Sequence, residues 1–269
     1  MDPSLDLDAY FERVRWGGDA RPTLATLTGL LGAHVTAVPF ENLDVLLGRP
    51  VRLDLGTLQD KLVRARRGGY CFEHATLFAA VLERLGFRPA RHTARVTLSA
   101  PRHAAPRTHM VLTVPLAEGT FVVDPGLGGV APRIPVPLLD GAQVEAGDER
   151  YHMRRDGDHW VFRTASADRS ADAWASTLRD DNPIDFEVGN HYTSSHPSSP
   201  FVTRLMLSAL TADTRVTVMN RDAAIRRAGE RRSMQLASRA ALRTFLLEHF
   251  GFDLPDVLQL RVPAIPEWT

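Results

Sequence analysis

The sequence contains a single cysteine, Cys71, so no disulfide can form within its 269 residues. Charge of neither sign is in excess, because Lys plus Arg and Asp plus Glu each number 32. No basic stripe interleaved with aromatic residues, the pattern typical of nucleic-acid binding, is present. The apolar runs fall short of the roughly 20 residues that cross a bilayer. These absences exclude a disulfide-stapled scaffold and predict no nucleic-acid and no membrane partner.

Signals for secretion and for metal binding are also missing. The first residues, MDPSLDLDAYFERV, are acidic and lack the basic and then apolar layout of a signal peptide, which predicts a cytoplasmic protein. The 10 histidines include no pair at i, i+4 spacing and the cysteine forms no C-x-x-C motif, so we expect no metal. The remaining composition, 44% hydrophobic and 24% charged, is typical of a globular protein with a sizeable core.

Two periodicities divide the chain. Apolar residues recur every three or four positions in residues 5–16, 23–35 and 55–67, and a similar stripe follows Cys71 and ends near Gly86, which predicts helices over the first 90 residues. From about residue 91 short β-type runs replace them, and the RDGD stretch near residue 156 is typical of a hairpin turn. The pattern predicts an α+β protein with a helical bundle followed by an antiparallel sheet or barrel.

The last third mixes both kinds of element. Residues 190–201, NHYTSSHPSSPF, are predicted to be a polar loop rich in Ser and Pro. TRVTVMN and RRSMQLAS favour strands, and RAALRTFLLEHF favours a helix with Ser238 as its N-cap and Gly251 at its end.

Cys71 occupies a position suited to a nucleophile. It follows Gly68 and Gly69 and lies at the predicted start of a helix, where unpaired N–H groups and the aligned peptide dipoles favour the reactive thiolate form of a cysteine. The same N–H groups are suited to holding the oxyanion of a tetrahedral intermediate. The alternative is that Cys71 is a small buried apolar residue, as isolated cysteines commonly are.

His109 and Asp124 are candidates for the base and its orienting group. They belong to two strand-like runs, THMVLTVPL and TFVVDPG, that are expected to pair as a hairpin. A four-residue loop from Leu116 to Gly119 puts residue 109 opposite 126, so Asp124 lies two positions away on the same face, roughly 7 to 8 Å diagonally. Asp124 would then fix the imidazole tautomer while the other ring nitrogen takes the thiol proton. The alternative is a solvent-facing histidine and an ordinary turn aspartate. His34 and His74, on helical stretches, are expected to be surface or partly buried residues.

The motifs RGGYCFEH, THMVLTV and FVVDPGLGG, in this order and spacing, resemble the arylamine N-acetyltransferase family. The stretches VPFENLDVLLGRPV and DFEVGNHYTSSHPSSPFV extend the similarity over nearly the whole chain. The resemblance implies a helical bundle over 1–88, an antiparallel β-barrel over 89–190 and an α/β lid over 191–269, a Cys-His-Asp transferase fold related to cysteine proteases.

The resemblance also implies an activity and its residues. The family transfers an acetyl group from acetyl-CoA, through an acetyl-cysteine, to an arylamine or arylhydrazine, with acetyl-CoA as co-substrate and no metal. A catalytic triad of Cys71, His109 and Asp124 is implied. Further residues are implied to contact the two substrates: Phe40, Val96 and Phe201 at the aromatic acceptor, and Gly126, Gly128 and Gly129 beside the CoA arm. Core packing would equally explain the aromatic residues, and turn geometry the glycines. Arg67 and Glu73 are expected to be a structural pair that holds the turn.

Three positions depart from the family pattern, and related activities stay open. Ala75 stands where an asparagine is usual, while Pro125 and Leu127 change the usual DVGFG stretch to DPGLG. One alternative is an amide synthase that uses a larger acyl thioester in natural-product biosynthesis. Others are a cysteine amidase or thioester hydrolase, in which water replaces the amine, and a binding protein that has lost activity.

Overall fold

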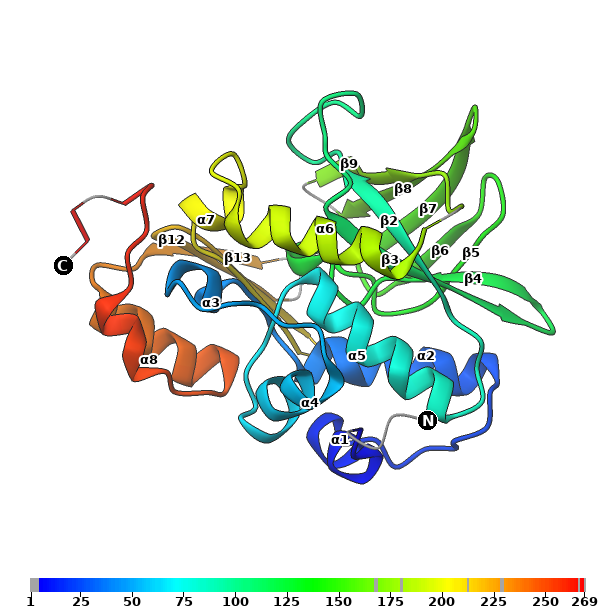
Figure 1. Cartoon of the computed structure of the whole chain (residues 1–269), viewed down its shortest axis with the longest axis horizontal. Coiled ribbons are helices and arrows are strands. Elements are labelled where there is room, and N and C mark those ends of the chain that lie inside the picture. Colours follow the sequence, from blue (N-terminus) through cyan, green and yellow to red (C-terminus); the bar gives the residue numbers. More distant parts are fainter. Residues whose placement is uncertain are drawn as a thin grey trace.

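The structure is a computed structural model, and it describes residues 5–166, 169–179, 181–211, 213–227, 230–265 and 267–268. Three groups of elements are visible in Figure 1: the helices of the first ninety residues, an eight-stranded sheet, and a five-stranded sheet that carries helix α8. The predicted α+β class is therefore confirmed. We retain the division at residues 88 and 190 as a proposal, and its second boundary falls within helix α6.

The first group consists of helices, and three of them begin with a side-chain N-cap. The members of the group are α1 (Leu7–Val14), α2 (Leu24–Ala37), α3 (Leu43–Leu46), α4 (Leu55–Leu58), the π-helical turn η1 (Gln59–Arg64) and α5 (Cys71–Arg84). The side chains of Asp6, Thr23 and Asp54 accept hydrogen bonds from the first turns of α1, α2 and α4. The single helix predicted over 55–67 is thus divided, because a wider turn follows α4.

The eight-stranded sheet curls into a nearly closed barrel. Its strands are β2 (Ala90–Val96), β3 (His109–Leu116), β4 (Gly119–Val123), β5 (Val136–Pro137), β6 (Gln143–Ala146), β7 (Glu149–Asp156), β8 (His159–Ser166) and β9 (Arg169–Ser176). The order is β5-β4-β3-β2-β9-β8-β7-β6 with antiparallel pairing, and the edge strands β5 and β6 contact each other. The hairpin predicted around residue 156 is confirmed by the pairing of Asp156 with His159.

Strand β3 is buried on both faces because it separates two cores. Met110, Leu112 and Val114 belong to the cluster formed with the N-terminal helices, whereas Val111 belongs to the cluster inside the barrel. Successive side chains of a strand point to opposite faces. His109 therefore shares the barrel-facing side of β3 with Val111.

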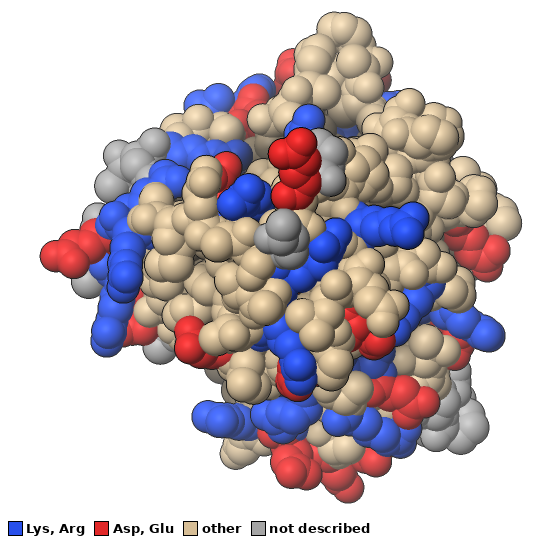
Figure 2. Space-filling view, turned by 90° about the vertical axis from the view of Figure 1, so that its left-hand side faces the viewer, with Lys and Arg blue, Asp and Glu red and all other residues tan. Residues whose placement is uncertain are grey.

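The five-stranded sheet combines both ends of the chain. It has the order β1-β10-β11-β12-β13, formed by β1 (Phe40–Glu41), β10 (Met206–Leu210), β11 (Thr214–Met219), β12 (Asp222–Arg227) and β13 (Glu230–Gln235). Helix α8 (Arg239–Phe250) packs on it and is followed by η3 (Pro255–Gln259). Ser238 caps α8 and Gly251 ends it in the left-handed region, as predicted. Lys and Arg lie among Asp and Glu on the face of the molecule that carries α8 (Figure 2).

The prediction of a polar loop over residues 190–201 is wrong. The segment contributes the second half of α6 (Pro183–Ser195) and the start of α7 (Pro200–Thr203), and within it only residues 196–199 lie outside a helix. Asp185 accepts a hydrogen bond from the backbone N–H of Asn182, and Pro183 occupies the first turn. These two features favour the start of α6 despite its polar composition. A Cβ on Gly189 would lie 2.7 Å from the Phe72 ring, so α6 rests directly on α5. In Figure 1, α6 runs from the side of the five-stranded sheet to the side of the eight-stranded sheet.

Among the described residues, no helix combines the length and the apolar character that crossing a membrane requires.

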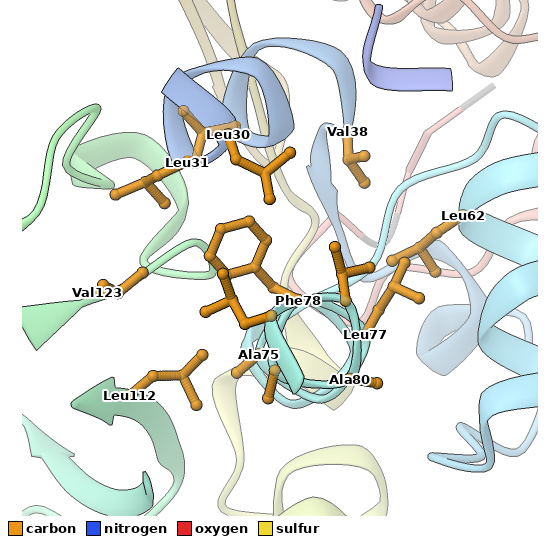
Figure 3. Packing of buried hydrophobic residues seen from close by; sticks show 14 of the residues in the cluster. Leu30, Leu31, Val38, Leu62, Ala75, Leu77, Phe78, Ala80, Leu112 and Val123 are labelled. Atoms are coloured by element: carbon orange, nitrogen blue, oxygen red, sulfur yellow. The ribbon is translucent and has the colours of Figure 1, made fainter. Parts of the chain in front are cut away.

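Phe78 is expected to be essential for stability because it is fully buried between helices and barrel strands. Figure 3 shows its ring among Leu30 and Leu31 of α2, with Leu112 and Val123 of the barrel nearby. Phe78→Ala should lower the free energy of unfolding by about 3–5 kcal/mol, measured by urea denaturation. Leu247→Ala, at a position 59% exposed, should change it by less than about 0.5 kcal/mol. Equal losses in both variants would contradict this assignment of the core.

Candidate active site

Cys71 is the first residue of α5 and is held there by a tight glycine turn. A Cβ on Gly68 would lie 2.1 Å from the Pro39 carbonyl oxygen, and one on Gly69 would lie 2.6 Å from a carboxylate oxygen of Glu73. Only glycine permits both approaches. The Cys71 side chain is 3% exposed, and its Sγ lies 3.6 Å from the carbonyl oxygen of Thr108, the residue before β3.

Glu73 closes this turn from within α5. Its carboxylate accepts a hydrogen bond from the Tyr70 N–H at 3.0 Å and contacts the Lys61 ammonium at 2.7 Å. Lys61 also contacts Asp44, which bonds Arg67, and Arg67 pairs with the buried Glu41. Arg67 and Glu73 thus hold the turn through separate partners rather than as the expected pair. Burial raises the pKa of Glu73, although the Lys61 charge opposes it.

His109 and Asp124 meet at the end of the predicted hairpin. Leu116 pairs with Gly119 and Leu112 with Val123, which is the expected register. His109 Nε2 donates to Asp124 Oδ2 at 2.8 Å, and both side chains are buried. The hairpin parity therefore brings together the two residues that the sequence singled out.

Asp124 receives two more hydrogen bonds. The indole Nε1 of Trp174, in β9, donates to Oδ2 at 2.9 Å, and the backbone N–H of Gly126 donates to Oδ1 at 3.3 Å. Sequence reasoning missed Trp174. A tryptophan within a strand indicates a buried N–H that needs an acceptor, but the pattern does not say which one.

The pKa of His109 is raised to about 10. Burial alone would lower it, but the charge of Asp124, the hydrogen bond to Asp124 and the interaction with Cys71 outweigh burial. Because Nε2 is committed to Asp124, Nδ1 is the ring nitrogen available to the sulfur. The imidazole thus lies between a cysteine at a helix N-terminus and a buried aspartate. This arrangement is suited to nucleophilic chemistry.

The loop after β4 reaches the cysteine itself. A Cβ on Gly126 would lie 2.6 Å from the Cys71 Cα, so this glycine serves close packing of the loop on α5. Gly128 has a φ of +60° and lies against the Phe40 ring. Gly129 lies against Thr217 of β11 and lines a cavity between the two sheets.

The three residues expected at the acceptor are only partly brought together. The rings of Phe40 and Phe201 are 6.2 Å apart, and Phe201 lies 5.4 Å from the Tyr70 ring beside the cysteine. Val96, at the end of β2, pairs with Trp174. Within the described ranges, no three His, Cys, Asp or Glu side chains gather so as to hold a metal ion.

The three departures from the family pattern occupy buried positions. Ala75 packs in the apolar cluster around Phe78 (Figure 3). Leu127 belongs to the barrel cluster. Pro125 has no N–H, and the N–H of the next residue, Gly126, bonds Asp124.

Comparison with known proteins shows the family to which the chain belongs. A family described as N-acetyltransferase matches residues 23–258. A curated arylamine N-acetyltransferase of Mycobacterium tuberculosis is 40% identical, with 94% of this chain and 92% of that protein covered. One of Mycolicibacterium smegmatis is 38% identical, with 97% of each covered. The structure of the Mycobacterium marinum arylamine N-acetyltransferase in complex with CoA superposes with a TM-score of 0.88 at 38% identity, covering 94% of each chain.

Removing the charge of Asp124 should lower the pKa of His109. In Asp124→Asn the burial that lowers this pKa remains while its largest opposing contribution is lost, so the value of about 10 should fall toward the ordinary 6.5. NMR titration of the histidine rings measures it, with His109→Gln identifying the signal. A pKa that stays near 10 in Asp124→Asn would show that another group holds the proton.

Proposed function

Because the chain belongs to the arylamine N-acetyltransferase family, we propose that it moves an acetyl group from acetyl-CoA to the nitrogen of an arylamine or arylhydrazine through acetyl-Cys71. The observation that carries the proposal is the buried His109, which bonds Asp124 through Nε2 and interacts with Cys71. The CoA bound to the M. marinum relative supports acetyl-CoA as the donor.

In the first half-reaction the Cys71 thiolate attacks the thioester carbonyl. The first N–H groups of α5 have no acceptor within the helix and are suited to the developing oxyanion. The carbon–sulfur bond to CoA breaks, and the leaving thiolate takes the proton from the His109 imidazolium. Acetyl-Cys71 and neutral His109 remain. Attack and departure involve similar sulfur centres, so the exchange passes between states of similar energy.

In the second half-reaction the amine attacks acetyl-Cys71. An arylamine is weakly basic and therefore unprotonated near neutral pH, and His109 accepts the proton as the carbon–nitrogen bond forms. Cys71 leaves as thiolate. Asp124 keeps the Nε2–H tautomer and stabilises the imidazolium, and Trp174 and Gly126 hold Asp124 in place. The paired rings of Phe40 and Phe201, with Val96, form the proposed acceptor side.

The cavity beside Gly129 fits the phosphate groups of CoA. It measures about 180 Å³, and its lining includes Glu149, Arg169, Arg215, Arg226 and Arg231. Arg215 is 6% exposed and pairs with Glu149 through Nη2, while its buried Nε and Nη1 have no protein acceptor among the described residues. Arg215 and Arg226 share the Glu149 carboxylate, and the two remaining buried donors of Arg215 favour an anion. We propose that Gly126, Gly128 and Gly129 line the path from this cavity to Cys71.

An acetyl adduct on Cys71 tests the mechanism. After mixing with acetyl-CoA and no amine, intact mass should show one acetyl group, absent from Cys71→Ala and discharged by an arylamine. Release of CoA without an adduct would favour a thioester hydrolase. If neither adduct nor CoA release appears, acetyl-CoA is not the donor, and a larger acyl thioester becomes the substrate to try.

Arg231→Ala tests the phosphate cavity. The KM for acetyl-CoA should rise about tenfold, equivalent to about 1.4 kcal/mol, while that for acetyl-pantetheine, which lacks the nucleotide phosphates, stays unchanged. The neighbouring Arg232, exposed on β13 and outside the cavity lining, is the matched control. Equal effects on both donors, or equal effects of both substitutions, would contradict this assignment.

A further inference from the structure

A buried chain of hydrogen bonds ends beside the nucleophile turn without entering the proposed chemistry. The Tyr10 hydroxyl of α1 bonds His34 Nδ1 of α2 at 2.8 Å, and His34 Nε2 lies 3.0 Å from His74 Nδ1 of α5. His74 Nε2 lies 3.1 Å from the Pro39 carbonyl oxygen. All three side chains are at most 1% exposed, so the prediction of surface or partly buried positions for His34 and His74 is wrong.

The proton positions along this chain are fixed by its last acceptor. A carbonyl oxygen can only accept, so His74 carries its proton on Nε2 and accepts at Nδ1. His34 must then donate from Nε2 and accept at Nδ1, and the donor is the Tyr10 hydroxyl. Both rings are neutral in this arrangement, because a second proton on either would place two N–H groups, or an N–H and an O–H, face to face. Burial lowers the pKa of His34 well below its usual value and that of His74 to about 4.

The Pro39 carbonyl joins this chain of hydrogen bonds to β1 and to the turn before Cys71. It also accepts a hydrogen bond from the N–H of Gly69 at 3.2 Å. The carbonyl oxygen of Gly69 in turn accepts a hydrogen bond from the N–H of Glu41 at 2.8 Å. Phe40 forms an isolated parallel bridge with Gly69. The position of the Pro39 carbonyl therefore affects both Phe40, the next residue in the chain, and the turn before Cys71.

The His74 ring also lies near the second loop of the site. Together with Phe40, Pro125 and Gly128 it lines a void of about 10 Å³. The ring therefore sits where β1, α5 and the loop after Asp124 converge. An apolar residue of the same size would fill this place but would remove one of the two hydrogen bonds that orient the Pro39 carbonyl, the other being that from the Gly69 N–H.

We propose that Tyr10, His34 and His74 form a neutral relay, here named the Tyr10–His74 relay, that positions the Pro39 carbonyl and thereby aligns Phe40 with Cys71 for attack by the acceptor. The proposal rests on the acetyl transfer proposed above. The relay reaches no reacting atom, and its members are positioning residues. Its loss should affect the amine step and the geometry of Cys71, and should leave binding of CoA in the cavity beside Gly129 unchanged.

The test compares His74→Leu with His74→Gln. Glutamine keeps an N–H for Pro39 and an oxygen for His34, whereas leucine keeps bulk alone. We expect His74→Leu to lower kcat/KM for the arylamine by about tenfold or more and His74→Gln to stay within about threefold of the wild type. The dissociation constant of CoA should be unchanged in both. A loss of unfolding free energy in His74→Leu with kcat/KM within twofold of the wild type would overturn the proposal, as would equal kinetic losses in the two variants.

Tyr10→Phe decides the matter if His74→Leu does not fold, because it removes one hydroxyl from the far end of the relay. A decrease in kcat/KM for the amine of about threefold or more supports the relay, and an unchanged value overturns it. Tyr192→Phe removes a hydroxyl on α6, outside the relay, and is the control.

The rate of Cys71 alkylation by iodoacetamide separates this proposal from the proposed function. If the wild type forms no acetyl adduct, acetyl transfer fails, yet a different alkylation rate in His74→Leu but not in His74→Gln still supports the relay. Equal alkylation rates in the two variants and the wild type, together with unchanged amine kinetics, overturn the relay while leaving acetyl transfer intact.

Discussion

The contact between the loop after β4 and the first turn of α5 joins the two halves of the candidate site. The cysteine belongs to the helices and the imidazole and carboxylate to the barrel, so no single element holds the chemistry. The Gly126 backbone approaches the Cys71 Cα so closely that a side chain would collide with it. The same residue donates its N–H to Asp124. One loop therefore both orients the carboxylate and packs the barrel against α5.

The charges near this contact are arranged so that each buried group has a partner. Asp124 has three donors, and Glu73 accepts both the Tyr70 N–H and Lys61. Burial penalises an unpaired charge or donor strongly, so partly satisfied networks destabilise a fold while fully satisfied ones specify a single geometry. Because these hydrogen bonds and ion pairs are complete, the turn before Cys71 is rigid. This rigid turn holds the Cys71 sulfur beside His109.

Local patterns predict much of this structure because the elements are strongly periodic. The start of α5 at Cys71, the register that joins His109 to Asp124, and the caps of α8 all follow from spacing and turn residues. The helix α6 could not be predicted in the same way, since its residues are polar and it is stabilised by packing against Phe72. Trp174 and the paired histidines were missed for a related reason. Their partners come from strands and helices far apart in the chain, and no spacing encodes which acceptor a buried donor reaches.

The departures at residues 75, 125 and 127 alter the shape of the site rather than its charges. Ala75 lies in an apolar cluster, where a side-chain amide would need partners for both its N–H and its C=O groups. Pro125 cannot donate, but the Gly126 N–H already satisfies Asp124. Leu127 packs into the barrel, while the next residue, Gly128, touches the Phe40 ring. Because Pro125 lines the same void as Phe40 and the changes leave Cys71, His109 and Asp124 untouched, their effect should fall on which aromatic acceptor fits and not on how the acetyl group moves.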